Sequence, residues 1–126
     1  MPADRETTDL AEVLSGRVLS RAENQFDRDR SGASSYFERS KAIFLHEDRT
    51  FRYEERTFSQ VCAAGMSLPS ERRQSGEGTW TVEVVTDRPA LVLRQDGRVA
   101  ACWHTRDGGA GVQYLDGEPW SRHRIR

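Results

Sequence analysis

The sequence predicts an all-β fold, an eight-stranded antiparallel up-and-down barrel with a short N-terminal helix. Two observations carry this prediction. After Gly16, apolar and polar residues alternate with a period of two, which is typical of strands with one buried face. The dipeptides Asp96-Gly97 and Asp116-Gly117 lie between such segments, and Asp-Gly favours the two-residue turn of a β-hairpin. A meander of hairpins loses its exposed edges when it closes on itself.

The N-terminal residues divide into a tail and a helix. Residues 1–8 are polar and charged, so we expect them to be disordered, and the single barrel domain then spans residues 9–126. Asp9 can cap a helix, Glu12 completes a capping box, and Gly16 is a suitable stop, which limits the helix to about two turns. The apolar face of this helix, which would plug one end of the barrel, consists of Leu10, Val13 and Leu14.

The strands of the barrel follow from the alternation and from the turn residues. We expect strands over residues 17–22, 36–47, 50–58, 79–86, 90–95, 98–105, 111–115 and 118–125. Residues 47–49 and 107–109 are expected to turn the chain, and the polar segments 23–35 and 63–78 to form loops. These two loops are long enough for the crossings of a two-sheet sandwich, which is the main alternative. The short turns elsewhere favour pairing of neighbouring strands and hence the barrel.

Length and charge bound the classes of function. The chain has 126 residues, the usual size of one domain. Its 19 basic and 20 acidic residues leave a net charge of −1, which argues against nucleic acid as a partner. No apolar segment approaches the length of a membrane span, and the N-terminus lacks a signal-peptide core. We therefore expect a soluble, cytoplasmic protein with no membrane partner.

Residues that could carry metal, covalent or cofactor chemistry lack the spacing that such chemistry requires. Cys62 and Cys102 form no CxxC pair, so we expect reduced, buried thiols, with a disulfide as the open alternative. No metal site is predicted, because neither HxH nor HExxH spacing relates His46, His104 and His123. His104 could act as a general base, with Glu47 and Asp107 as nearby partners. Without a nucleophile motif or a phosphate-binding loop, catalytic residues stay unknown and no cofactor is expected.

Residue parity identifies a candidate ligand-binding set. Side chains two positions apart on a strand share a face, so an inward Trp80 and Trp103 imply an aromatic interior. Buried charged groups in that interior must be paired or reach water. The candidate ligand-binding residues are Phe51, Tyr53, Glu55, Trp80, Trp103, Tyr114, Trp120 and Arg122. They either grip a ligand in a cavity or fill a small core, and the sequence leaves both interpretations open.

The order of the motifs resembles that of small lipocalin-like (calycin) β-barrel proteins. A turn between apolar strands at 44–51 precedes Gly78-Thr79-Trp80, and hairpin segments follow at 91–97 and 114–120. Lipocalins carry their Gly-x-Trp on the first strand, whereas here it lies in the middle of the chain. The resemblance implies a barrel able to hold one small ligand. It also allows an enzyme, because some cyclases and isomerases of secondary metabolism use such barrels.

These observations predict a small-molecule-binding, lipocalin-like β-barrel with an aromatic-lined cavity and a small apolar or amphipathic partner. Two alternatives remain open. The cavity could belong to a cyclase or isomerase acting on a polyketide-like substrate, and turnover cannot be decided from sequence. The chain could also be a protein-interaction or peptidase-inhibitor module that uses its N-terminus and the segment 63–78. A homodimer is compatible with each of these functions.

Overall fold

The computed structural model describes residues 2–28, 30, 32–63 and 65–125, which form one helix and eight strands. The elements are α1 (Pro2–Leu14), β1 (Arg17–Arg28), β2 (Ser34–Leu45), β3 (Thr50–Ala63), β4 (Met66–Val85), β5 (Arg88–Gln95), β6 (Arg98–Gly109), β7 (Val112–Leu115) and β8 (Glu118–Arg124). Each strand pairs antiparallel with the next, and β1 pairs with β8 to close the barrel. The predicted fold class, an eight-stranded up-and-down barrel with an N-terminal helix, is confirmed.

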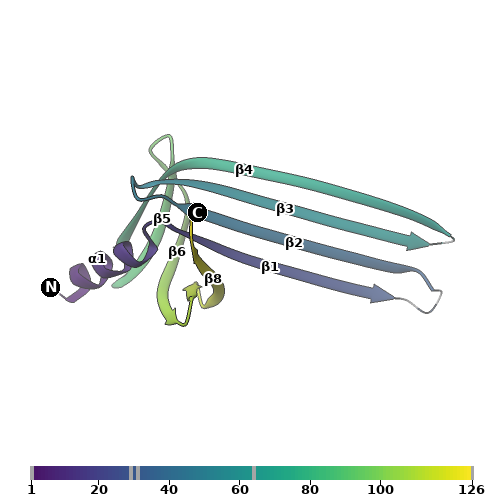
Figure 1. Cartoon of the computed structure of the whole chain (residues 1–126), viewed down its shortest axis with the longest axis horizontal. Helices are drawn as coiled ribbons and strands as arrows, with labels where there is room; N and C mark the ends of the chain where they lie inside the picture. The colour runs from purple at the N-terminus through teal and green to yellow at the C-terminus, as the bar shows by residue number, and fades with distance from the viewer. Residues whose placement is uncertain (1, 29, 31, 64, 126) are drawn as a thin grey trace.

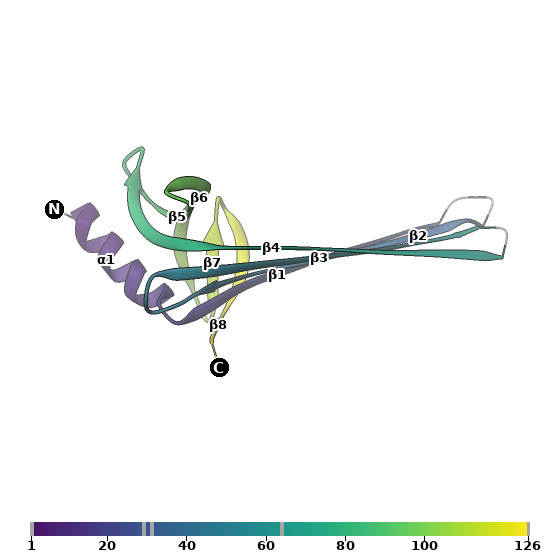
Figure 2. The same ribbon diagram turned by 90° about the horizontal axis from the view of Figure 1, so that it is seen from above.

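The first four strands are longer than the barrel needs. The pairing of β1 with β8 covers only residues 17–20 of β1, and β4 pairs with β5 only from Thr79 onward. Beyond these points β1–β4 continue together as a four-stranded sheet, which we call the arm and define as residues 22–28, 34–40, 56–63 and 66–73. Figure 1 shows the arm extending from the barrel, and Figure 2 shows it edge-on as a single layer.

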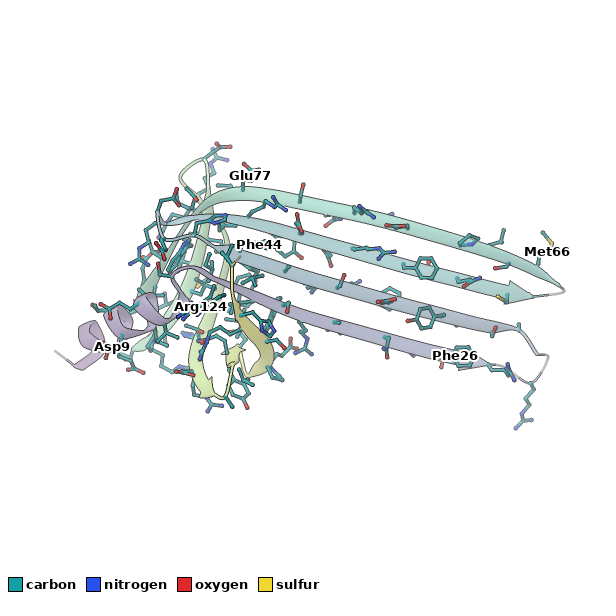
Figure 3. All side chains as sticks on the ribbon, in the orientation of Figure 1. Asp9, Phe26, Phe44, Met66, Glu77 and Arg124 are labelled. Atoms are coloured by element: carbon teal, nitrogen blue, oxygen red, sulfur yellow. The ribbon has the colours of Figure 1, made fainter. Side chains whose placement is uncertain are left out.

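The arm corrects the prediction of loops at 23–35 and 63–78. Most of both segments is strand, and β4 runs without a break through the second of them. No layer covers the arm in the described part of the chain, so polar residues occupy both of its faces and the alternation that marks a half-buried strand is lost. Phe26 and Met66, at the free end of the arm in Figure 3, are 60% and 64% exposed.

The hydrophobic core lies where the strands wrap around one another. Leu19, Ile43 and Leu45 are fully buried on the first two strands, and Phe51 and Trp80 join them from β3 and β4. Helix α1 lies on the opposite side of β5–β8 from the arm, as Figures 1 and 2 show. Its apolar face packs against this core and so plugs one side of the barrel. Leu10 and Leu14 on this face are buried.

Helix α1 begins earlier than the sequence indicates. It starts at Pro2, whereas the prediction places its cap at Asp9 and expects residues 1–8 to be disordered. Proline is well suited to the first turn of a helix, because its missing N–H would have no partner there. Glu6, Thr7 and Thr8 are therefore helical, and the cap that the capping-box pattern suggests is not used.

Two of the predicted hairpin turns are confirmed in detail. Asp96 and Gly97 have φ angles of 52° and 77°, and Asp116 and Gly117 have 50° and 80°. Positive φ at both central residues is the signature of the type I′ turn, whose twist matches that of the paired strands. The turn expected at 107–109 is wrong, because the chain turns at 110–111, and 107–109 belong to β6 where its register with β7 shifts.

Candidate ligand-binding cavity

The barrel contains a partly open cavity of about 540 Å³ next to the base of the arm. Its apolar lining includes Phe51, Tyr53, Leu93, Trp103, Leu115 and Trp120. A second, more open hollow of about 1010 Å³ lies alongside. The two share four lining residues, Lys41, Gln74, Ser75 and Trp120, so the inner cavity is continuous with the open hollow. A volume of several hundred Å³ is typical of sites that hold a small organic molecule.

Strand parity places the aromatic rings of the cavity. Phe51 and Tyr53 are two residues apart on β3 and therefore face the same side of the sheet. Trp103 of β6 pairs with the fully buried Leu91 of β5, which fixes its side chain on the inner face. Trp120 of β8 is only 6% exposed. Four of the predicted binding residues are thus brought together around one cavity: Phe51, Tyr53, Trp103 and Trp120.

Tyr53 and Glu55 form the polar wall of this region. The Tyr53 hydroxyl donates a hydrogen bond to Glu55 Oε2 at 3.1 Å, and Arg39 Nε lies 3.4 Å from Glu55 Oε1. Burial, together with the hydrogen bond to Glu55 and its negative charge, raises the pKa of Tyr53 to about 12, and Arg39 opposes this shift. Tyr53 is therefore a neutral phenol at physiological pH. Glu55, a predicted binding residue, lines the open hollow rather than the inner cavity.

Two basic residues, Arg21 and Lys41, lie side by side where the arm joins the barrel. They are paired in register across β1 and β2. Arg21 has acidic partners, with its Nε 3.2 Å from Glu23 and its Nη1 3.6 Å from Glu118. Among the described residues, no carboxylate comes within ion-pair distance of the Lys41 ammonium group. The sequence analysis did not select Lys41, although it shares the parity of the buried Ile43 on the same strand.

Trp80 lies outside the cavity and has a structural role. It is fully buried, and its indole N–H donates to the carbonyl of His46 at 2.9 Å. The guanidinium carbon of Arg49 lies 4.5 Å from its ring centroid, and Arg49 also donates to the carbonyl of Ala11 in α1. Trp80 thus joins β4 to the turn between β2 and β3. It is not among the residues that line either hollow.

The inward placement expected for Tyr114 is wrong. Its neighbours Gln113 and Leu115 take the buried positions of β7, so Tyr114 faces outward, where the guanidinium carbon of Arg106 lies 4.2 Å from its ring centroid. A polar residue occupies the interior here because Gln113 donates to the Thr105 hydroxyl and accepts from Arg122 Nη1. The buried amide is therefore satisfied, which removes the usual cost of its burial.

Arg122 points inward as expected but does not line the cavity. Its Nη1 lies 3.1 Å from Asp107 Oδ1 and donates to Gln113 Oε1 at 2.7 Å. The hydrogen bond from the backbone N–H of Gly109, followed by the Arg122 guanidinium, keeps the pKa of Asp107 below its usual range. Because Asp107 is held by these two groups, it gives no support to His104 as a general base.

The part of the chain that the structure describes contains neither a cluster of metal-ligating side chains nor a disulfide. There, no three His, Cys, Asp or Glu side chains cluster closely enough to hold an ion. Cys62 and Cys102 are free thiols, with Cys102 exposed. The expected burial is therefore wrong for both cysteines, since Cys62 is only half-buried and Cys102 takes the outer face between the inward Trp103 and Ala101.

Comparison with family models, curated proteins and solved structures finds no match to this chain. The closed eight-stranded antiparallel barrel is consistent with a calycin-like fold, and the likeness rests on architecture alone. Across the residues described, no helix is long and apolar enough to cross a membrane.

Proposed function

We propose that this protein binds a small, partly apolar molecule in the barrel cavity. The observation that carries the proposal is the 540 Å³ cavity with four aromatic rings in its lining and an open hollow beside it. Aromatic side chains offer large contact areas to an apolar ligand, and the neighbouring hollow gives it a route of entry. Helix α1 covers the other side of the core, so entry is expected from the side of the arm.

Catalysis in the same cavity is the second candidate, and the Tyr53–Glu55 pair is the observation that favours it. A phenol beside a carboxylate could orient a polyketide-like substrate for cyclisation or isomerisation. Binding is the better-supported function, because the Tyr53 hydroxyl already donates to Glu55 and the Glu55 carboxylate also faces Arg39. A change in the absorbance of a bound polyene over time, lost in Glu55→Gln, would instead favour the enzyme.

The alternative of a protein-interaction module is weakened, because the loop that it requires at 63–78 is mostly strand. It uses the N-terminus and residues 63–78 as flexible contact segments. Residues 66–78 are instead part of the regular strand β4, paired along their length with β3. Within 63–78, residues 74–76 line the barrel cavity, so this part of the segment is placed for ligand binding, which is therefore preferred.

The test is an equilibrium titration with Nile red, a neutral apolar dye whose emission reports a dry environment. Two Trp→Phe variants form a matched pair, because Trp103 lines the cavity and Trp80 does not. Trp103→Phe should weaken dye binding about threefold or more while the fold stays intact. Trp80→Phe should lower the melting temperature and leave the affinity of the folded fraction unchanged. Absence of saturable binding by the wild-type protein, or equal affinity in Trp103→Phe, would overturn the proposal.

A further inference from the structure

Lys41 is the one lysine of the chain, against 18 arginines, and it lies at the junction of the two hollows. It is half-buried on β2, two residues before the buried Ile43 and four before the buried Leu45. Residues at this spacing share a face, so Lys41 is the polar end of the strand face that forms the core. Its ammonium group stands where an apolar interior gives way to water.

The acidic side chains around the hollows are already engaged. Glu54 accepts from Arg52, Glu55 from Tyr53, and Asp116 from the backbone N–H of His104 at 2.8 Å. The last of these carboxylates, Glu118, pairs with Arg21. None of the four is within ion-pair distance of Lys41 in the described structure.

The other basic side chains around the hollows are engaged as well. Arg56 Nε and Arg73 Nε lie 3.0 and 2.8 Å from Glu71 Oε1. Arg21 pairs with two glutamates and donates to the carbonyl of Pro119 at 3.2 Å. Within the described residues, Lys41 is thus the basic lining residue left without a counterion.

The register of the sheet places Lys41 between a like charge and a carboxylate that has other partners. Lys41 is directly opposite Arg21 on β1, and like charges in that arrangement destabilise a sheet. On its other side it is opposite Glu55 of β3, whose two oxygens face Tyr53 and Arg39. An anion at the Lys41 ammonium group would relieve the repulsion and complete the pairing of charges.

We propose that Lys41 binds the anionic head group of an amphipathic ligand, a carboxylate, whose apolar chain lies against Trp103 and Trp120. This assignment rests on the proposed function, since the chain of such a ligand must occupy the barrel cavity. Trp120 lines both hollows together with Lys41, so one molecule can contact both residues. An ammonium group binds a carboxylate through charge-assisted hydrogen bonds, which are stronger than neutral ones.

The experiment compares amphiphiles that share one chain and differ in the head group. Decanoate, decanol and decylammonium are titrated separately into the full-length protein by calorimetry, with intrinsic tryptophan fluorescence as a second signal. Decanoate should bind about tenfold more tightly than decanol, and decylammonium more weakly than either. Added salt should weaken the binding of decanoate and leave that of decanol nearly unchanged.

Three variants assign the effect to Lys41. Lys41→Met should remove the preference for decanoate over decanol, and Lys41→Arg should keep the preference. Arg73→Gln removes an equal charge from the rim of the open hollow, and it should keep the preference because Arg73 is paired with Glu71. Melting curves of each variant establish that it is folded at the temperature of the titration.

The outcomes separate this inference from the proposed function. Equal binding of decanoate and decanol by the wild-type protein, or a preference that survives in Lys41→Met, would overturn the head-group assignment and leave cavity binding intact. Binding of neither amphiphile nor Nile red would overturn both proposals. A preference lost equally in Arg73→Gln would show that general surface charge, and not Lys41, selects the anion, and would also overturn the assignment.

Discussion

The indole N–H of Trp80 donates to the carbonyl oxygen of His46 at 2.9 Å, which ties the barrel half of β4 to the residue that follows β2. The backbone reinforces the connection, because the Trp80 N–H donates to the carbonyl of Arg49 at 2.8 Å. Arg49 in turn stacks on the Trp80 ring and reaches Ala11 of α1. One aromatic residue therefore joins the strand that leaves the arm, the turn between β2 and β3, and the helix that covers the core.

Trp80→Phe should destabilise the protein by about 2 kcal/mol, because it removes the indole hydrogen bond and leaves unfilled volume in the core. For a domain of this size that corresponds to a fall in melting temperature of roughly 5–10 °C. Urea unfolding followed by circular dichroism gives the free energy of unfolding directly. The His46 carbonyl keeps a second donor, the N–H of Arg49 at 3.1 Å, so a loss above about 4 kcal/mol would indicate a different cause.

Gly78→Ala should be strongly destabilising, because β4 passes too close to its neighbours for a side chain. A Cβ at this position would lie 2.0 Å from the carbonyl oxygen of Arg94 and 2.8 Å from a ring carbon of Phe51. The backbone of β5 cannot move aside without loss of its pairing, so we expect a cost of about 3 kcal/mol or failure to fold. The measurement is the free energy of unfolding in urea.

Gly76→Ala is the matched control for Gly78, two residues away on the same face of β4. Here the nearest atom is Gln95 Nε2 at 2.6 Å, the end of a flexible side chain that can rotate away. The cost should therefore stay below about 1 kcal/mol. Similar losses in the two alanine variants would contradict the close approach of the backbones at Gly78.

Gly97→Val tests a turn in which glycine is required by its backbone φ angle and not by lack of space for a side chain. Gly97 has a φ of 77°, and nothing lies within 4 Å of the place its Cβ would take. A β-branched residue at this φ should cost about 1 kcal/mol or more, whereas Gly97→Asn should cost less because asparagine tolerates positive φ. Thermal melting of both variants makes the comparison. Equal melting of Gly97→Val and the wild-type protein would exclude the type I′ turn.

The sequence predicts those features of the fold that are decided by residues close together in the chain. The Asp96-Gly97 turn was predicted correctly because two residues decide its geometry. The arm was missed because no covered face imposes an alternating pattern on residues 66–75, all of which are exposed. Only the barrel halves of β1–β4 carry that pattern, as at Leu19 and Ile43.

The candidate site could be predicted where a strand has one clearly apolar face, because that face decides which side chains point into the barrel. Trp103 and Trp120 line the cavity as parity indicates. Tyr114 was misplaced because hydrophobicity argues for an inward tyrosine and an outward glutamine, whereas partners of Gln113 that are distant in sequence reverse the order. Lys41 was overlooked because its importance comes from the absence of a counterion among the described residues, which depends on the packing of strands that are far apart in the sequence.

Alkaline pH should destabilise the protein through Tyr53. Its pKa rises from 10.0 to about 12 in the folded state, so between these values the folded protein holds a proton that the unfolded chain has lost. The stabilisation is complete below pH 10 and is lost as the pH rises through 12. Spectrophotometric titration should show a late tyrosinate transition that is missing in Tyr53→Phe. The alkaline fall in unfolding free energy should also be smaller in that variant, and identical profiles would refute the assignment.

The arm should open independently of the barrel. Its strands bury little apolar surface, as residues 23–28 of β1 and 66–75 of β4 are exposed, whereas Leu19 and Trp80 on the barrel halves of the same strands are fully buried. Local opening costs least where few contacts are broken, and β1 and β4 are the edge strands of the arm.

Hydrogen exchange read by mass spectrometry should therefore show peptides from 66–75 exchanging roughly 100-fold faster than those from 79–85. Equal protection along the whole of β4 would contradict independent opening of the arm. A dependence of that protection on protein concentration would indicate that a second copy covers the arm.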